Sequence, residues 1–461
     1  MGDDAQRLRE TQARENAHAA GNGALALTLE AATLLFVNGQ TTERVILAVE
    51  RLAKALGYDA GVFPQWGQLN VWLYDDLHDD QYGHGGGARE DARAALPTGV
   101  DMAKVTATLD VIDRVCDGRT TPDAARSSLE AVKALPPVPL LRFAAMTAIG
   151  AAAFGVIFGT AHLPSLLVMA FSAGTGAFLR RWLAGFTRGP FVQPFCAALL
   201  AGLVGAIALR LDLGTTLSLV ALCPCMVLVP GPHFLNGALD LVRLRIPLGL
   251  ARLGYALLIV LMISAGLLAG LALGGSTLSV SAPSVAVPLA YEVVAAGVAV
   301  AAIGTFFAIP WRAMPVPILI GMLAHAARWT MIEVGDAGVV AGALVACLII
   351  GTIGTPIADR MRLPFAALAF VSAVSLIPGV YLFRTAEGVV SLVMPGSRAT
   401  PALLLDTLAN GATAFMIVLA IVFGLVVPRV CMESRRLALT RQAPAAGPPL
   451  PTRHRAGESF R

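Results

Sequence analysis

Charged side chains are scarce in this chain. Only 14% of its 461 residues are Asp, Glu, Lys or Arg, whereas 56% are hydrophobic and 46 are glycine. Soluble proteins carry about 25% charged residues, so this composition excludes a protein that is soluble throughout. Abundant glycine among apolar residues is typical of closely packed membrane helices. The sequence therefore predicts a polytopic α-helical membrane protein.

Lysine is missing from most of the chain, since Lys54, Lys104 and Lys133 all fall within the first 138 residues. That segment holds 13 Lys and Arg against 20 Asp and Glu, a net charge of −7. The remainder holds 21 against 10, a net charge of +11. This split predicts an acidic soluble domain followed by a membrane body with arginine-only cations.

A secretory signal is also missing, because residues 1–24 are polar and lack an apolar core. We therefore expect a polar, disordered N-terminus over 1–24 and a cytoplasmic domain over 25–138. Within that domain, residues 25–57 predict two helices and "DAGVFPQWGQLNVWLYDD" predicts two strands around a turn. Two further amphipathic helices are expected at 101–117 and 121–134, which makes a small α+β domain.

Patterns for catalysis or metal binding are few. The six cysteines are scattered, and Cys223 and Cys225 in "LCPCMV" have no partner at zinc-site spacing, so buried thiols are expected. "HGGG" at 84–87 is accompanied by no G-x-S-x-G nucleophile elbow. We predict no enzyme, no metal and no cofactor. A membrane-anchored hydrolase is an alternative only if Cys116 or His84 proves essential.

From residue 143 onward, apolar runs long enough to cross a bilayer succeed one another. The ten predicted spans are 143–162, 165–179, 191–209, 214–230, 250–273, 288–309, 313–330, 337–356, 363–380 and 402–427. With the N-terminus inside, arginines gather in the cytoplasmic loops, and the outer loop at 274–287 carries no charge. The positive-inside rule then places both termini in the cytoplasm of a bacterial inner-membrane protein.

The motif "LVPGPHFLNGALDL" at 228–241 is echoed by "LIPGVYLFRTAEGV" at 376–389, with Pro230 and Pro378 separated by 148 residues. The same shift carries each span of the first half onto one of the second. The body is therefore expected to be two five-helix repeats, and because five is odd, the second should be inverted. Their expected limits, with the disordered cytoplasmic tail that follows, are 139–274, 275–427 and 428–461. Inverted repeats with paired interruptions are typical of secondary transporters.

Each Pro-Gly pair should break a membrane helix, because proline cannot donate the helical hydrogen bond and glycine lets the backbone turn away. Broken backbone within a membrane is tolerated where it is buried or lines a wet cavity. A helix that restarts there would direct free N–H groups at a substrate carboxylate. A plain loop boundary is the alternative for either motif. The candidate substrate-binding and coupling residues are Pro230, Gly231, His233, Asn236, Asp240, Pro378, Gly379, Tyr381, Arg384, Glu387, Asp406 and Asn410.

Several candidates have a competing interpretation. Asp240 or Glu387 would suit an ammonium or a proton, but Glu387 and Arg384 lie near the outer surface, where solvent exposure is an alternative. His233 could be an interfacial histidine. Asp406 and Asn410 share one helix face, but Asp406 is about one turn from the outer end, where snorkelling competes. The same alternative applies to three other outer-end residues, Glu292, His325 and Arg328.

The acidic domain with "LLFVNGQTTERVILAVERLAKALG", followed by ten helices bearing the two Pro-Gly motifs, resembles the threonine/serine exporter family over residues 25–430. The motifs, their spacing and the G-x-[TS]-T-x-R pattern at 39–44 are the specific parts. The resemblance implies two related exporter modules, which are separate chains in some members. Four residues match the first motif by position and two match the second, namely Pro230, Gly231, Asn236, Asp240, Pro378 and Gly379. His233 departs from the small or hydroxyl residue expected there.

The resemblance implies that L-threonine and L-serine leave the cytoplasm at the expense of the proton gradient. The expected partners are therefore these amino acids or similar ones, protons and the lipid bilayer, with a possible homo-oligomer and no nucleic acid. Our prediction is a secondary active transporter that works by proton antiport with alternating access. The alternatives are a passive channel and an exporter of another small polar metabolite.

Overall fold

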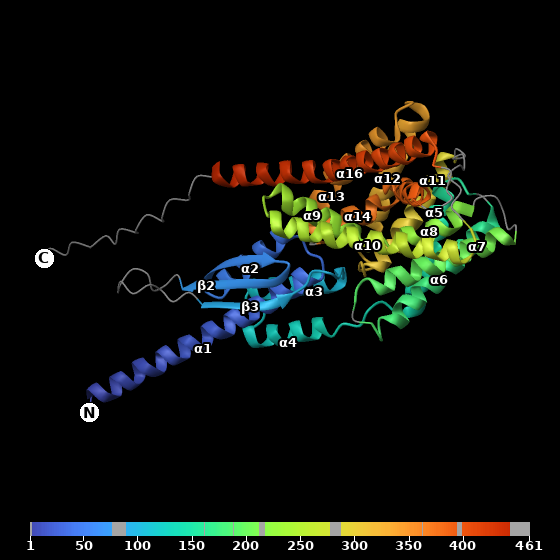
Figure 1. Cartoon of the computed structure of the whole chain (residues 1–461). Helices are drawn as coiled ribbons and strands as arrows, with labels where there is room; N and C mark the ends of the chain where they lie inside the picture. Colours follow the sequence, from blue (N-terminus) through green and yellow to red (C-terminus); the bar gives the residue numbers. More distant parts are fainter. Residues whose placement is uncertain are drawn as a thin grey trace.

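The N-terminal part of the chain forms a layer of four helices and one sheet on one side of a larger helical body (Figure 1). The computed structural model describes residues 2–75, 89–160, 162–187, 189–211, 217–276, 287–361, 363–393 and 399–442. The elements of this N-terminal layer are α1 (Gly2–Val37), α2 (Thr42–Ala55), β1 (Tyr58–Gln65), β2 (Gly67–Asp75), β3 (Arg89–Ala95), α3 (Met102–Cys116) and α4 (Pro122–Lys133).

Two helices of the N-terminal layer begin directly after residues that favour helix starts. Asp101 caps α3 by accepting a hydrogen bond from the Lys104 N–H at 3.1 Å, and Thr121 precedes Pro122 at the first position of α4. The strands form an antiparallel sheet in the order β1-β2-β3. The predicted hairpin turns at Gly67, whose φ of +97° suits glycine. The third strand, β3, was not predicted.

One hydrophobic core joins the N-terminal layer to the body. Apolar side chains of α1, α2, the sheet, α3 and α4 pack together, and Leu248 at the start of α10 is buried among them. The N–H of Met102 donates to the carbonyl of Phe307 at 3.0 Å, which ties the start of α3 to the end of α11. The N-terminal layer is therefore packed against the helical body rather than tethered to it.

Among the described residues, the body consists of twelve α-helices and two short helical segments that are not α-helices. In chain order they are α5 (Leu140–Ile157), α6 (Leu163–Leu183), α7 (Val192–Arg210), α8 (Leu217–Met226), α9 (Gly231–Val242), α10 (Ile246–Leu273), α11 (Leu289–Phe306), α12 (Pro315–Trp329), η1 (Thr330–Val334), α13 (Val339–Met361), α14 (Phe365–Ala373), η2 (Val374–Leu376), α15 (Gly379–Val393) and α16 (Pro401–Gln442).

Nine helices in the described ranges are long and apolar enough to cross a membrane, and two further helix pairs pass the same test together. One of the nine, Ala19–Val37 of α1, is 67% buried and belongs to the core of the N-terminal layer. The bent pairs are α8 with α9, at 55°, and α14–η2 with α15, at 67°. Without α1, eight straight and two bent spans remain, which agrees with the ten predicted. The chain is a multi-pass helical membrane protein.

Helices α5–α10 and α11–α16 pack in parallel patterns. In the first set α5 packs on α6, α6 on α7, α7 on α10 and α9 on α10. In the second set α11 packs on α12, α12 on α13, α13 on α16 and α15 on α16. Helix α5 of the first set also packs on α11 of the second set. Each helix therefore has a counterpart with the same neighbours.

The structure differs from the predicted disorder at both ends. Residues 2–24 form the first part of α1, because Ala, Arg, Glu and Gln favour helix and extend the turns that the core anchors. Residues 428–442 continue α16, although the tail was expected to be disordered from residue 428. Ion pairs of Arg429 and Glu433 account for this continuation. Residues 443–461 lie outside the described part of the chain.

Candidate functional site

The two Pro-Gly motifs break two helices, and the breaks pack against each other. A methyl group on Gly231 would overlap the ring of Phe370 in α14, and one on Gly379 would overlap the end of Met226 in α8. Pro230 is the last residue before α9, and Pro378 occupies the same place before α15. Each break therefore contacts the helix that leads into the other break.

The backbone at the two breaks is partly satisfied by local hydrogen bonds. The N–H of Gly231 donates to the carbonyl of Val229 at 3.0 Å, and that of Gly379 donates to Ile377 at 2.8 Å. The expectation that these first N–H groups are free is therefore not met in this conformation. The first N–H group after each proline is thus already hydrogen-bonded within the break.

The polar face of α9 is buried under the N-terminal layer. Asn236 and Asp240 lie one turn apart and are 3% and 1% exposed. The amide of Asn236 donates through Nδ2 to the carbonyl of Gly39 at 3.2 Å. Asp240 Oδ2 accepts a hydrogen bond from Arg252 Nη1 at 2.9 Å, and Arg245 Nη1 lies 3.8 Å from Oδ1. The loop before α2 thus covers the residues that the sequence predicted for binding.

Three buried atoms in this cluster have no hydrogen-bond partner among the described residues, namely Asn236 Oδ1, Arg252 Nη2 and Arg245 Nη1, the last of which lies 3.8 Å from Asp240. The Arg252 side chain is 1% exposed and its guanidinium lies 5.3 Å from the centre of the Phe36 ring. An unpaired buried polar atom costs about 1–3 kcal/mol, which is why such atoms are rare in native proteins. A free acceptor and a free donor are therefore available together beside Asp240.

His233 takes part in aromatic packing. Its ring meets Tyr255 of α10 edge-on at 5.1 Å, and Trp66, from the turn between β1 and β2, lies 5.3 Å from Tyr255. His233 is 6% exposed and is therefore buried within the protein. The first motif is thus held by the hairpin as well as by the loop before α2.

The second motif offers a smaller polar site. A hollow of about 30 Å³ is lined by Arg328, Ser375, Pro378, Tyr381 and seven other residues, which is room for one water molecule. Glu387 is buried, not solvent-exposed, and its Oε2 has no partner within the described ranges. Both Tyr381 and Arg384 are half-buried.

Asp406 and Asn410 are not brought to either break. Asp406 is exposed on the first turns of α16, and the Asn410 amide donates to the Asp406 backbone carbonyl at 2.7 Å. This is a bond within one helix and leaves the Asp406 carboxylate free to point outward, as the snorkelling alternative has it.

A buried cluster of ionisable residues was underestimated from the sequence. His325 is fully buried, its Nε2 lies 2.7 Å from Glu292 Oε1, and its Nδ1 lies 3.0 Å from Ser375 Oγ. Arg328 Nη1 donates to the same Glu292 oxygen at 3.3 Å. The sequence placed the three ionisable residues near helix ends, and only the packing of α11, α12 and η2 shows that they meet.

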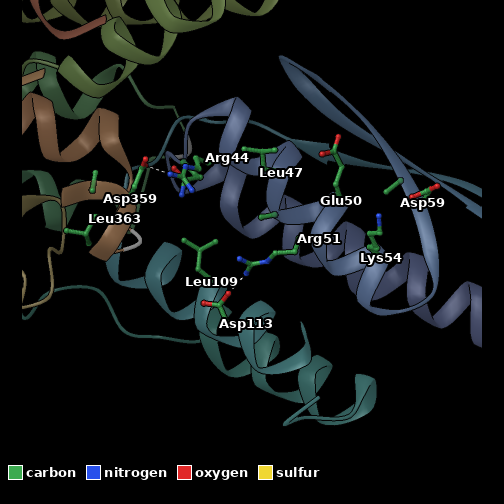
Figure 2. Close-up of a pocket in the computed structure, with 14 residues that line it drawn as sticks. Arg44, Leu47, Glu50, Arg51, Lys54, Asp59, Leu109, Asp113, Asp359 and Leu363 are labelled. Atoms are coloured by element: carbon green, nitrogen blue, oxygen red, sulfur yellow. Dashed lines mark hydrogen bonds and ion pairs between the residues drawn. The ribbon is translucent and has the colours of Figure 1, made fainter. Parts of the chain in front are cut away.

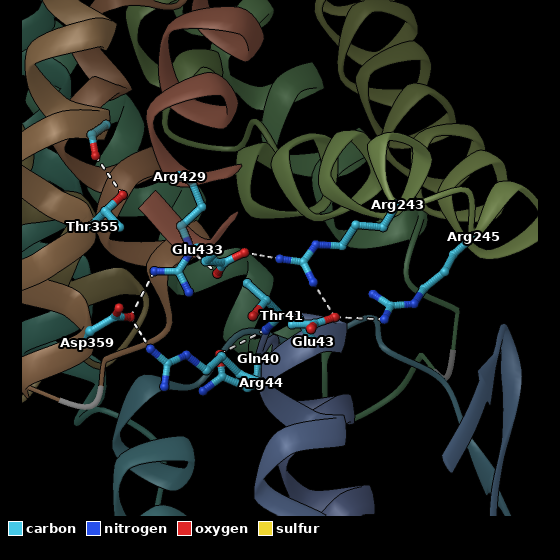
Figure 3. Close-up of polar contacts among 11 residues, drawn as sticks. Gln40, Thr41, Glu43, Arg44, Arg243, Arg245, Thr355, Asp359, Arg429 and Glu433 are labelled. Carbon is cyan, nitrogen blue, oxygen red and sulfur yellow. Dashed lines mark hydrogen bonds and ion pairs between the residues drawn. The ribbon is translucent and has the colours of Figure 1, made fainter. Parts of the chain in front are cut away.

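A chain of ion pairs joins the N-terminal layer to both halves of the body (Figure 3). Glu43 of α2 pairs with Arg243 and with Arg245, the latter at 2.8 Å. Arg243 also pairs with Glu433, which forms an ion pair with Arg429 at 2.6 Å, from Nε to Oε1. The first half is thereby connected to α16 through one arginine.

The chain continues through Asp359 at the end of α13. Asp359 accepts hydrogen bonds from Arg429 Nη1 at 2.8 Å and from Arg44 of α2 (Figure 3). The whole series, from Arg252 and Asp240 to Arg44, is here called the arginine network. It was missed because Glu433 and Arg429 were assigned to a disordered tail.

Charge strengthens this contact at neutral pH. Burial alone would raise the pKa of Glu43, but hydrogen bonds from Arg245 and Arg243 outweigh it, so that the pKa lies below its usual value. A lowered carboxyl pKa stabilises the folded state above the unfolded pKa, and this stabilisation is lost as the pH falls through the folded pKa. The contact of Glu43 with Arg243 and Arg245 should therefore loosen only in acid.

Beside this contact lies a cleft of about 690 Å³ between α2, α3, β1 and the end of α13 (Figure 2). Its ionisable lining carries both signs, and the residues are Arg44, Glu50, Arg51, Lys54, Asp59, Asp113 and Asp359. Arg51 pairs with Asp113, and Arg44 pairs with Asp359 (Figure 2). The cleft therefore opens onto one end of the arginine network.

The described residues contain no group of three or more His, Cys, Asp or Glu side chains placed to hold a metal ion. For the hydrolase alternative, Cys116 Sγ lies 3.6 Å from the Arg51 carbonyl, and His84 lies outside the described residues.

Two family models match the chain. The model described as "putative threonine/serine exporter" matches residues 26–274, and one described as "threonine/serine exporter" matches residues 292–431. No curated protein sequence and no solved structure matches. The first match alone covers more than half of the chain, and together they leave the polar ends and the loop between the two halves unmatched. With the two broken helices in place, one in each matched part, the chain belongs to the threonine/serine exporter family as a two-module member.

Proposed function

We propose that this protein exports threonine, serine and similar small amino acids from the cytoplasm by proton antiport with alternating access. Family membership supports a membrane exporter of amino acids. The observation that carries the finer proposal is the reciprocal packing of the two breaks, Gly231 on Phe370 and Gly379 on Met226. Paired broken helices at the centre of a repeat are where transporters bind their substrates.

The parallel packing of α5–α10 and α11–α16 supports two structural repeats. Each repeat has five spans if a bent pair counts as one, and a repeat with an odd number of spans enters the membrane from the opposite side in its second copy. The second repeat is then inverted relative to the first. One break approaches the cytoplasm and the other approaches the outside, which is the arrangement that alternating access requires.

The proposed substrate site lies on the first broken helix. Arg252 Nη2 is a free donor for the substrate carboxylate, and Asn236 Oδ1 is a free acceptor for its ammonium group. Asp240, already paired with Arg252, supplies a second acceptor for the ammonium. A free donor together with a free acceptor matches a zwitterion, which carries one group of each charge. A substrate with only a carboxylate or only an ammonium group would leave Asn236 Oδ1 or Arg252 Nη2 unpaired.

The conformation supports a state closed on the cytoplasmic side. Arginine-rich loops support a cytoplasmic position for the termini and the arginine network, by the positive-inside rule. There the Gly39 carbonyl holds the Asn236 amide, and the N-terminal layer covers α9. Cytoplasmic opening would separate this layer from α9 and the end of α16, and so release the site to substrate.

Export can be tested in cells loaded with a threonine-containing dipeptide, with and without a protonophore. The wild-type protein should lower internal threonine, and the protonophore should abolish the effect. Efflux that survives the protonophore would instead indicate a passive channel, because a channel follows only the substrate gradient. Efflux no faster than in cells without the protein, at normal membrane abundance, would remove threonine from the proposal.

Replacing Asn236 by alanine should weaken substrate binding. A hydrogen bond to a charged group contributes about 1.5–3 kcal/mol, so the KM for threonine should rise by about tenfold or more. Asn410→Ala is the matched control, because Asn410 lies away from both breaks and bonds only within α16 among the described contacts. Equal KM values for the two variants would contradict the proposed site.

A further inference from the structure

The cluster around His325 is a buried group of ionisable residues outside the proposed substrate site. His325 is 0% exposed and the Glu292 side chain is 8% exposed. Ionisable side chains within membrane-spanning helices are costly to bury and usually serve function. This cluster lies on the second repeat, next to the second break, and the arginine network does not include it.

When Glu292 is ionised, hydrogen-bond chemistry determines which atoms of the cluster donate and which accept. A carboxylate can only accept, so His325 Nε2 must carry the proton shared with Glu292 Oε1 at 2.7 Å. A neutral imidazole has one N–H, so Nδ1 must accept from the Ser375 hydroxyl at 3.0 Å. Addition of a proton to Nδ1 reverses this second bond, and Ser375 then becomes the acceptor.

Ser375 connects His325 to the broken helix, so a reversal of the His325–Ser375 hydrogen bond acts next to the second break. It lies in η2, three residues before Pro378, where the chain leaves helical geometry. Ser375 and Pro378 line the hollow of about 30 Å³, which has room for a water molecule that could deliver the proton. In the topology proposed above, this break faces the outside, from which protons enter in an antiport cycle.

We infer that Glu292 and His325 form the proton-carrying site of the transporter and that Ser375 couples its protonation to the second break. The inference rests on the proposed antiport function and assigns the proton to the second repeat, leaving the substrate on the first. A proton from the outside binds His325 Nδ1, and the same proton leaves Nδ1 after the conformational change. The N–H bond at Nδ1 is the only bond that forms and breaks in this step, and no other group is transferred.

The neighbours of His325 favour this role over that of Asp240. Within the described residues, the charged or titratable groups near the pair are Arg328, which bonds Glu292 directly, and Tyr381 and Glu333, which interact with Arg328. Helix α13 presents Gly342 to Arg328. Glu292 has one arginine as counter-charge, and His325 Nδ1 lies within hydrogen-bond distance of a serine hydroxyl. Asp240, by contrast, has two arginines as neighbours, Arg252 at 2.9 Å and Arg245 at 3.8 Å.

The test uses the full-length protein in liposomes and two readouts, threonine–threonine exchange without a pH gradient and threonine accumulation driven by an imposed pH gradient. Exchange moves substrate both ways and needs no proton transfer. We expect His325→Gln and Glu292→Gln to retain exchange and to lose gradient-driven accumulation. His162→Gln is the matched control, because His162 also bonds a serine, Ser165 at 3.0 Å, but is exposed. It should retain both activities.

Glu292→Gln keeps the size of the side chain and an acceptor for Nε2, so it tests the inference even if His325→Gln does not fold. Gradient-driven accumulation in Glu292→Gln would overturn the inference. So would loss of both activities in Glu292→Gln, because the residue would then serve folding or substrate binding. Absence of threonine exchange in the wild-type protein would instead remove the proposed function itself, which keeps the two failures distinct.

Discussion

Gly231→Ala should abolish transport and sharply lower the stability of the protein. The added methyl group would overlap the ring of Phe370, which is itself buried at 8% exposure in the packed centre. A rigid ring cannot move aside without disturbing α14, so the cost should reach or exceed the upper part of the usual overpacking range, about 3 kcal/mol. Thermal unfolding in detergent and threonine efflux are the measurements.

Two glycine variants serve as graded controls for this result. Gly379→Ala would meet only the flexible end of Met226, which can adopt another rotamer, so its loss of stability should be smaller. Gly254→Ala meets nothing within 4 Å and should be neutral or slightly stabilising in α10. If Gly231→Ala behaved like Gly254→Ala, the close packing of the two breaks would be refuted.

Asp359→Asn should weaken the contact between the N-terminal layer and the second half of the body. Asp359 is the shared acceptor of Arg44 and Arg429, and Arg429 is only 5% exposed. The substitution removes one of the two carboxylates that pair with the buried Arg429, the other being Glu433. Breaking a buried ion pair costs up to about 3–5 kcal/mol, and the remaining Glu433 pair should keep the loss below that figure. We expect a marked fall in the thermal stability of the detergent-purified protein and faster proteolysis of the loops that join the layer to the body.

Asp406→Asn is the control for this prediction. It makes the same chemical change on α16, but Asp406 is exposed and lies outside the arginine network. It should leave both stability and threonine efflux at wild-type values. A fall of equal size in both variants would show that the effect of Asp359→Asn reflects general loss of an acid and does not report on the network.

The sequence by itself determined the spans, the acidic N-terminal layer and the two broken helices. The long apolar runs of the body cross the bilayer because its hydrocarbon core favours apolar side chains. A Pro-Gly pair interrupts a helix through its own local geometry, whatever the rest of the chain does. The shift of 148 residues also predicted that the two breaks correspond. These features depend on local composition and spacing, which one sequence displays directly.

Only the tertiary structure decided which polar residues meet. Asn236 faces the carbonyl of Gly39, about two hundred residues away in the chain, and Glu433 in the supposed tail pairs with Arg243. Acidic residues that both lie near an outer helix end also differ in their surroundings. Glu292 belongs to a buried cluster with His325, whereas Asp406 is exposed. The reason is physical: a buried charge is tolerable only beside its partner, and partners from separate helices become neighbours only through packing.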